Sequence, residues 1–189
     1  MLKDLVLKNR SYRAFDESRP ITAKDMRALV DLARNVPSGM NKQPLRYRIV
    51  SERAELVKMV ANTRYAGALS IKLPPEGQNP TGFIVIFNDS EINSPDFLSL
   101  KDCGIAAQTI LLGAAEMGFG GCMLASFKPE ILNADLNIPA RYVPLLAIAL
   151  GTPAETVVLE DADEINAPYY RDADNVHHVP KRKLEDILL

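Results

Sequence analysis

The spacing of apolar residues predicts that the chain opens with two helices. Residues 2–6 carry Leu and Val at helical spacing and predict a short first helix. A second helix is predicted after Thr22, which can cap its N-terminus and has Asp25 at the reciprocal position of a capping box. This helix should end before Pro37, because a residue that precedes proline is pushed out of the helical region. Its buried stripe should comprise Met26, Leu29, Val30 and Ala33.

Three segments have the pattern of strands. Residues 46–50 alternate polar and apolar side chains, whereas residues 83–87 and 143–150 are nearly continuous apolar runs typical of buried strands. Ser51 should cap a helix between the first two strands. The residues expected on one face of that helix are Leu56, Val57, Val60 and Ala61.

The longest helix is predicted between about Leu98 and Met117, closed by Gly118 as a left-handed C-cap. Pro129 suits the first turn of a further short helix. The residues of the long helix expected to face mostly inward are Ile105, Ala106, Thr109, Ile110 and Ala114.

Two stretches lack such a pattern. Residues 63–82 contain three prolines and three glycines, and a loop of this length usually covers or builds a site. The last 36 residues are polar and interrupted by prolines. Their only helical stripe is Leu184, Ile187 and Leu188. A tail with so little core of its own is expected to pack on another surface.

Composition narrows the class of protein. A chain of 189 residues with 47% hydrophobic and 24% charged residues fits one globular domain, residues 1–189. No apolar run approaches the roughly 18 residues of a membrane span, and the N-terminus lacks the layout of a signal peptide. Two cysteines, Cys103 and Cys122, fit a reduced, cytoplasmic chain. A net charge of -2 argues against general nucleic-acid binding.

The charge is distributed unevenly. Residues 1–60 carry 13 Lys and Arg against 7 Asp and Glu, whereas residues 61–180 carry 6 against 15. A basic N-terminal third can bind an anionic ligand, although a mixed, solvated surface explains the same numbers.

Two basic clusters are candidates for that ligand. Arg10-Ser11-Tyr12-Arg13 places two guanidinium groups three residues apart with a hydroxyl between them, a set that can hold a phosphate. Lys181-Arg182-Lys183 lies near the C-terminus. The alternatives are an ordinary solvated turn and a solvated tail.

Two loops are further candidates. Residues 37–44, Pro-Ser-Gly-Met-Asn-Lys-Gln-Pro, offer donors and acceptors to a heteroaromatic ring, although Ser, Gly and Asn are also standard turn residues. Residues 118–122, Gly-Phe-Gly-Gly-Cys, allow close backbone approach to a flat ligand, although a helix C-cap and tight turn explain at least Gly118. The glycine spacing is not that of a dinucleotide-binding loop.

Other chemistries receive less support. Adjacent His177 and His178 have no further ligand at metal-binding spacing, and Cys122 is more simply a buried structural thiol. The chain contains neither a nucleophile elbow nor a phosphate-binding loop of the Walker type. The absence of an obvious acid, base or nucleophile fits a reaction carried by a cofactor.

Taken in order, these segments resemble the nitroreductase family. The opening resembles it at residues 10–16, Arg-Ser-Tyr-Arg-Ala-Phe-Asp, and at residues 37–44. The central helix, with Gly104-Ile105-Ala106-Ala107-Gln108, and the turn at 118–122 are similar to the family's helix and flavin-side turn. The terminal basic segment is similar to its last phosphate contact. The resemblance covers nearly the whole chain.

The resemblance implies an α+β fold: a mostly antiparallel central sheet surrounded by helices, with an extended C-terminal tail, about residues 152–189, exchanged in a homodimer. FMN would lie at the dimer interface. Contacts with the flavin phosphate, ribityl chain and pyrimidine edge would come from Arg10, Ser11, Arg13, Lys181 and Arg182. Contacts from the other subunit would come from Pro37, Ser38 and Asn41. Residues beside the ring would be Gly120, Gly121 and Cys122.

The chain departs from the family pattern in places. Asn9 stands where many members have another basic residue, so that contact is weaker or replaced. Leu45 stands where members often have Trp, a position expected to serve packing. Lys72 precedes the proline-rich loop where some members use a basic residue near the flavin pyrimidine.

The resemblance implies a ping-pong reaction in which NADH or NADPH gives hydride to the flavin and a nitroaromatic, quinone or similar acceptor then takes the electrons. No covalent or metal-binding residue is required. Two alternatives stay open: a specialised flavin enzyme of the same fold that acts on another substrate, and a flavin-binding protein without turnover.

Overall fold

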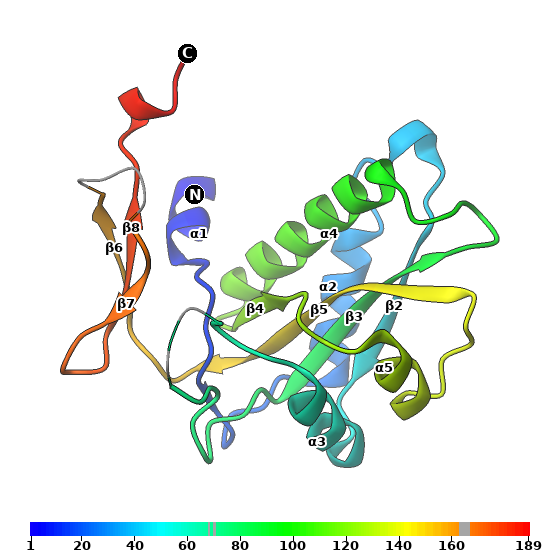
Figure 1. Ribbon diagram of the computed structural model, residues 1–189, viewed down its shortest axis with the longest axis horizontal. Helices are drawn as coiled ribbons and strands as arrows, with labels where there is room; N and C mark the ends of the chain where they lie inside the picture. The colour runs from blue at the N-terminus through cyan, green and yellow to red at the C-terminus, as the bar shows by residue number, and fades with distance from the viewer. Residues whose placement is uncertain (68, 70, 163–166) are drawn as a thin grey trace.

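The computed structural model describes residues 1–67, 69, 71–162 and 167–189 and is built around a five-stranded antiparallel sheet (Figure 1). The strands follow the order β1-β5-β3-β2, and β4 also pairs with β5. Their bounds are β1 Phe15–Asp16, β2 Leu45–Val50, β3 Gly82–Asp89, β4 Gly120–Leu124 and β5 Tyr142–Pro153. Because β3 and β5 are central, residues 83–87 and 147–150 are buried, as the sequence predicts. Residues 143–146 of the predicted run are only half-buried.

Helices cover both faces of this sheet, so the molecule has two cores (Figure 1). The helices α2 (Ala23–Ala33) and α4 (Phe97–Glu116) lie on one face, and α3 (Arg53–Asn62) and α5 (Pro129–Asp135) lie on the other. Successive residues of β3 alternate between the cores: Ile84 packs with α2 and α4, whereas Val85 packs with α3 and α5.

Several predicted elements are confirmed. Thr22 and Asp25 form the capping box of α2, and Met26 and Leu29 of that helix are fully buried. The long helix, the short helix from Pro129 and the three strands occur close to the predicted bounds. The antiparallel sheet with surrounding helices confirms the predicted α+β class.

Other expectations are wrong in detail. Ser51 does not cap α3, because the helix starts one residue later with Glu52 as its N-cap. On the predicted face of α3, Leu56 and Val60 do pack against the core, beside the fully buried Met59. Val57, which is 62% exposed, and Ala61 point outward instead. In α4 the side chain of Ile105 points outward, 43% exposed, because Ala106 and Ile110 occupy the stripe against the sheet.

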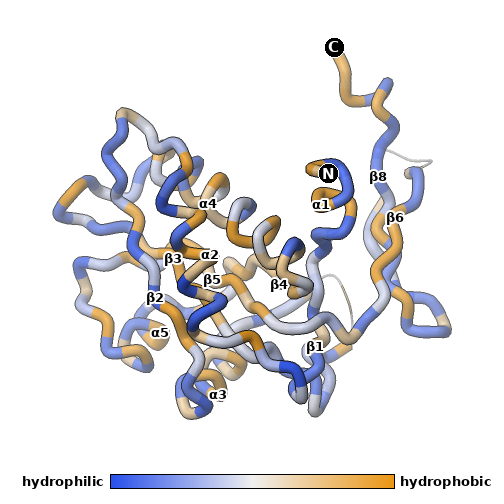
Figure 2. The backbone as a smooth tube through the Cα atoms, turned by 180° about the vertical axis from the view of Figure 1, so that it is seen from behind, coloured by the Kyte–Doolittle hydropathy of each residue, from blue (hydrophilic) through white to orange (hydrophobic). Residues whose placement is uncertain are grey.

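The C-terminal extension has a small sheet of its own. The strands β6 (Val157–Asp161) and β8 (His177–Lys181) pair in parallel, and β7 (Tyr170–Arg171) pairs antiparallel with β8. This sheet stands beside α1 (Leu2–Lys8), apart from the central sheet, in both views (Figures 1 and 2). The chain ends with a short 3-10 turn, Leu184–Asp186, and exposed apolar residues. Residues 163–166 of the predicted extension lie outside the described residues.

The helix α4 is long and apolar enough to cross a membrane by length and composition alone. Half of the qualifying window is buried inside the protein. The core helix of a soluble protein passes the same test, and the packing of α4 against the central sheet is that of a core helix.

Candidate functional site

The N-terminal basic motif is held along the edge of β4. Ser11 forms a parallel bridge with Gly121, and the backbone N–H of Tyr12 donates to the carbonyl of Gly121 at 3.0 Å. The motif therefore joins the strand that follows α4, although more than 100 residues separate the two in sequence. Residues 10–13 and 120–122, predicted separately, lie together.

The two arginines of this motif differ in exposure: Arg13 is buried, whereas Arg10 is half-buried. Arg10 donates through Nη2 to the carbonyl of Val6 at 2.6 Å, and Arg13 is only 8% exposed. The Nε atoms of both side chains are buried and have no hydrogen-bond partner within the described residues. No carboxylate within that part of the chain pairs with either guanidinium. Buried donors with uncompensated positive charge favour an anionic ligand.

Arg13 is also contacted by the C-terminal extension. Its Nη1 lies 3.0 Å from Nε2 of His177 and donates to the carbonyl of Ser11 at 3.1 Å, while the ring of Tyr169 lies 5.3 Å from its guanidinium carbon. Burial, followed by the charge of Arg13, lowers the pKa of His177 to about 4, so this histidine is neutral at physiological pH.

Below this contact lies a buried carboxylate. Glu155 accepts hydrogen bonds from the backbone N–H groups of Arg13 and Ala14 and pairs with Arg171. Glu155 thus fixes the backbone of the motif and leaves the guanidinium of Arg13 unpaired. Sequence reasoning missed Glu155 and His177, because nothing in their local sequence indicates a partner more than 140 residues away. It also missed Arg171, whose partner Glu155 lies 16 residues before it.

Lys181 is the last residue of β8, the strand that begins with His177, and Arg182 follows it. Both residues are exposed. Lys181 is four residues beyond His177, about 13 Å at the rise of a strand. Neither side chain forms a hydrogen bond with Arg10 or Arg13. Their closing on the same anion stays a prediction.

The glycines at 120 and 121 have a packing role within the chain. A Cβ at Gly120 would collide with the ring of Tyr12, and one at Gly121 would collide with the carbonyl of Ala149. Cys122 is buried in the core, and burial raises the pKa of its thiol, which makes it unreactive. Residues 120–122 form a strand where a turn was one expectation, and their contact with a flat ligand stays a prediction.

The amide-rich loop is anchored to α4 by a buried carboxylate. Asp102 accepts from the hydroxyl of Ser38 at 2.6 Å and from the N–H of Gly39 at 3.0 Å. The same hydroxyl accepts from the N–H of Gln43 at 3.0 Å. Because a hydroxyl has one hydrogen, Ser38 can offer a ligand only its backbone N–H or a remaining lone pair.

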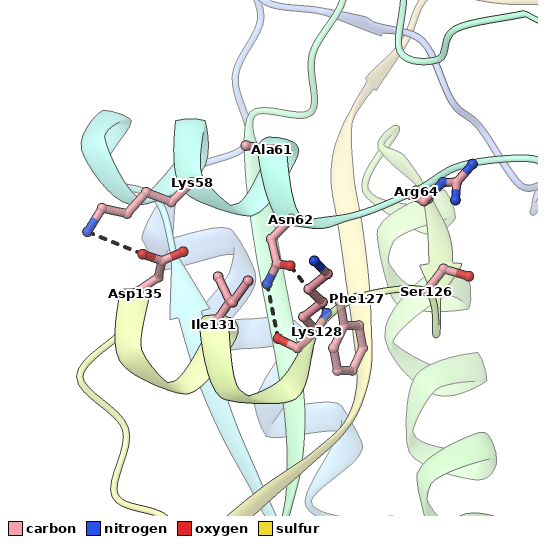
Figure 3. A pocket seen from close by; sticks show the side chains of 9 residues that line it. All are labelled: Lys58, Ala61, Asn62, Arg64, Ser126, Phe127, Lys128, Ile131 and Asp135. Atoms are coloured by element: carbon pink, nitrogen blue, oxygen red, sulfur yellow. Dashed lines mark hydrogen bonds and ion pairs between the residues drawn. The ribbon is translucent and has the colours of Figure 1, made fainter.

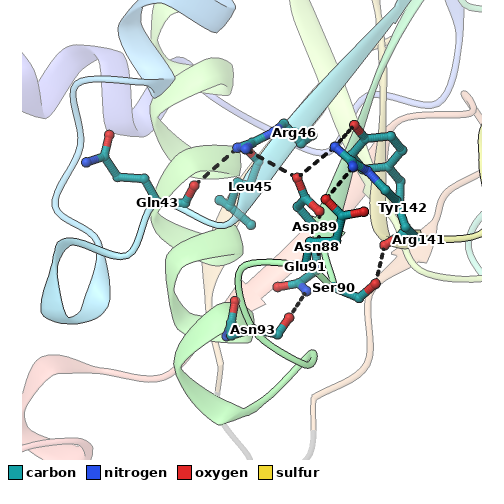
Figure 4. Close-up of polar contacts among 10 residues, drawn as sticks. All are labelled: Gln43, Leu45, Arg46, Asn88, Asp89, Ser90, Glu91, Asn93, Arg141 and Tyr142. Atoms are coloured by element: carbon teal, nitrogen blue, oxygen red, sulfur yellow. Dashed lines mark hydrogen bonds and ion pairs between the residues drawn. The ribbon is translucent and has the colours of Figure 1, made fainter.

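Ion pairs anchor the other end of this loop (Figure 4). Arg46 donates to the carbonyl of Gln43 at 3.2 Å and pairs at 3.3 Å with Asp89, which is buried. The N–H of Asp89 donates to the carbonyl of Pro44 at 2.9 Å. Between the anchors Asn41 has a φ of 53° and an exposed side chain. Pro37 is exposed as well, so the loop presents both residues to the surroundings.

The two groups of predicted ligand residues lie at opposite ends of α4. Gly39 packs on Leu98 in its first turn, whereas Gly120 follows its last turn. A helix of 20 residues is about 30 Å long. One chain therefore does not bring Ser38 and Asn41 to the arginines of the N-terminal motif.

Two adjoining cavities lie beside loop 63–82, of which residues 68 and 70 are outside the described residues. Lys72 is exposed and lines a cavity of about 960 Å³ with Tyr65 and Pro74. A second cavity, of about 520 Å³ between α3 and α5, shares Ala61 and Arg64 with the first (Figure 3). The loop thus forms walls of a cavity, as its length suggested.

The geometry defines an α+β protein with a buried cationic site at the meeting point of its N-terminal motif, β4 and its C-terminal extension. The chain belongs to the nitroreductase family, whose model matches residues 6–86 and 81–152. A protein of Archaeoglobus fulgidus, provisionally named NADH dehydrogenase/NAD(P)H nitroreductase, is 27% identical over 165 residues, 85% of this chain and 90% of that protein.

Solved structures agree on the fold. A nitroreductase family protein from Streptococcus pneumoniae superimposes with a TM-score of 0.71 at 17% identity and covers 100% of this chain and 99% of its own. A nitroreductase-type protein from Desulfovibrio desulfuricans, solved in complex with FMN, gives a TM-score of 0.69 at 24% identity over 82% of this chain and 87% of its own.

Proposed function

We propose that this protein is a cytoplasmic FMN-dependent oxidoreductase that takes hydride from NADH or NADPH and reduces nitroaromatic, quinone or related small acceptors. The observation that carries the proposal is the pair of arginines, Arg10 and Arg13, whose Nε atoms are buried and have no hydrogen-bond partner among the described residues. Phosphate oxygens fit such donors, because arginine binds them through charge-assisted, often bidentate hydrogen bonds. The FMN-bound relative and the NAD(P)H-linked name of the archaeal protein support the choice of ligand and donor.

The chain's own residues would bind and orient the flavin. Arg10, Ser11 and Arg13 would hold its phosphate and ribityl chain, with Lys181 and Arg182 closing from β8. FMN would supply hydride acceptance at N5 and a ping-pong transfer to the acceptor. Lys72, on the wall of the larger cavity, is positioned to place positive charge near a ligand there.

The proposal includes a homodimer with two shared sites. Because Pro37, Ser38 and Asn41 lie a helix length away from the arginines, a second copy would have to supply them. The outer face of α4 supports this arrangement. It exposes Phe97, Leu100 and Ile105 at helical spacing, with exposed fractions of 69%, 60% and 43%.

The test is the absorption spectrum of the purified protein followed by anaerobic mixing with NADH and NADPH. The expected result is bound or readily acquired FMN that loses its visible absorption with at least one donor and regains it with a quinone or nitroaromatic. The variant Arg13→Ala should bind FMN at least about tenfold more weakly. Protein that takes up no FMN would overturn the proposal, and flavin that neither donor reduces would remove NAD(P)H from it.

A further inference from the structure

The contact between Arg13 and His177 leaves one edge of the guanidinium for a ligand. Nη1 has two protein acceptors, the carbonyl of Ser11 at 3.1 Å and Nε2 of His177 at 3.0 Å. A guanidinium carries five N–H donors, and the hydrogens of Nε and Nη2 point the same way and form a fork. Nε of Arg13 is buried without a partner in the described chain, so this fork is unused.

The hydrogen bond requires neutral His177 with its proton on Nδ1. Nε2 accepts from Arg13 only when it carries no proton. The ring is 1% exposed and is surrounded by the cations Arg13 and Arg171, with His178 next in sequence. The carboxylate of Glu155 is engaged by Arg171 and by two backbone N–H groups. This surrounding keeps the imidazole uncharged.

The same cluster has an excess of positive charge. Arg13 and Arg171 are both buried, whereas Glu155 contributes a single negative charge and His177 contributes none. The carboxylates of Glu160 and Asp172 are bound by His178, each at 3.0 Å. A buried cluster with one uncompensated cation favours an anionic ligand, because charge is costly to bury unpaired.

We propose that His177 is the positioning residue of the flavin site: by accepting from Nη1, it turns Arg13 so that the Nε–Nη2 fork faces the anionic part of the ligand. The inference rests on the proposed function and extends the site to a residue of the C-terminal extension. Docking of the extension and binding of FMN would then be coupled, because each orders Arg13 for the other.

The experiment measures FMN binding by the apoprotein through quenching of flavin fluorescence. His177→Leu removes the acceptor, His177→Gln retains a side-chain oxygen that reaches Arg13, and His177→Asn is polar but too short. We expect about tenfold weaker binding for Leu and Asn and near wild-type binding for Gln. His178→Leu, on the same strand but without contact to Arg13, is the matched control and should bind FMN as the wild type does.

The inference would be overturned if folded His177→Leu and His177→Asn bound FMN as tightly as the wild type. It would also be overturned if His177→Gln bound FMN as weakly as His177→Asn. If His177→Leu does not fold, the comparison of His177→Gln with His177→Asn decides. Failure of the wild type to bind FMN would instead overturn the proposed function. Repeating the titration with riboflavin, which lacks the phosphate, assigns the fork to phosphate if the effect of His177 disappears and to the flavin ring if it remains.

Discussion

Two adjacent histidines of β8 occupy opposite electrostatic environments. Burial and neighbouring guanidinium groups lower the pKa of His177 to about 4, whereas hydrogen bonds to Asp172 and Glu160 raise the pKa of His178. An unfolded histidine titrates near 6.5. The folded chain therefore binds fewer protons at His177, and more at His178, than the unfolded chain does.

These shifts predict opposite pH dependences of stability. His177 costs stability as the pH falls from about 6.5 towards about 4, because the unfolded state then binds the extra proton. His178 stabilises the fold fully below about pH 6.5 and loses this contribution as the pH rises through its folded pKa. Urea unfolding between pH 4.5 and 8.5 should show the wild-type advantage over His177→Gln shrinking at low pH and that over His178→Gln shrinking at high pH. Parallel curves for the two variants would contradict this prediction.

At the scale of elements, α4 ties the amide-rich loop to the core through one carboxylate. Asp102 is 5% exposed and accepts from the hydroxyl of Ser38 and the N–H of Gly39. Both donors lose their partner if the carboxylate is removed, and unsatisfied buried groups cost about 1–3 kcal/mol each.

Asp102→Ala should therefore lower the free energy of unfolding by about 2 kcal/mol and loosen residues 38–43. Limited proteolysis with mass spectrometry should detect new cleavage in this loop, and urea unfolding gives the change in stability. Glu116→Ala, an exposed position on the same helix, is the matched control and should alter neither measurement. A loop that stays resistant in Asp102→Ala would show that the ion pairs of Asp89 suffice to hold it.

The sequence predicted elements whose signals are local. The capping box of Thr22 and Asp25 and the apolar run of β3 follow from spacing alone. It did not predict β4, because glycine disfavours strands and the reason for Gly120 and Gly121 is contact with Tyr12 and Ala149, which only the fold brings near. Residue type and order identified Arg10, Ser11 and Arg13 as candidate site residues. The partner of Arg13, His177, lies 164 residues away and has no local signature.

At the scale of the whole molecule, the outer face of α4 is the surface through which the proposed homodimer would form. Leu100 is 60% exposed in a row with Phe97 and Ile105. In the proposed homodimer this row is covered, and each flavin site receives one loop from the other copy. Disrupting the interface should then also empty the site.

Leu100→Glu should convert the dimer to a monomer and weaken FMN binding by at least about tenfold, because a charge is costly to bury in an apolar interface. Light scattering after size-exclusion chromatography gives the mass, and flavin fluorescence gives the affinity. Leu32→Glu, an exposed apolar position on α2 that lines neither cavity beside loop 63–82, is the control and should leave both unchanged. A monomeric variant that still holds FMN tightly would contradict a shared site.

The contacts of Glu155 and His177 with Arg13 have a consequence for synthesis on the ribosome. The arginines of the motif precede the central sheet along the chain, and that sheet has all its strands once Pro153 has been added. Glu155, Arg171 and His177 come afterwards. A nascent or truncated chain can thus complete its core while the backbone and side chain of Arg13 still lack their partners. Binding of the proposed FMN should therefore strengthen once residues 155–177 have been added.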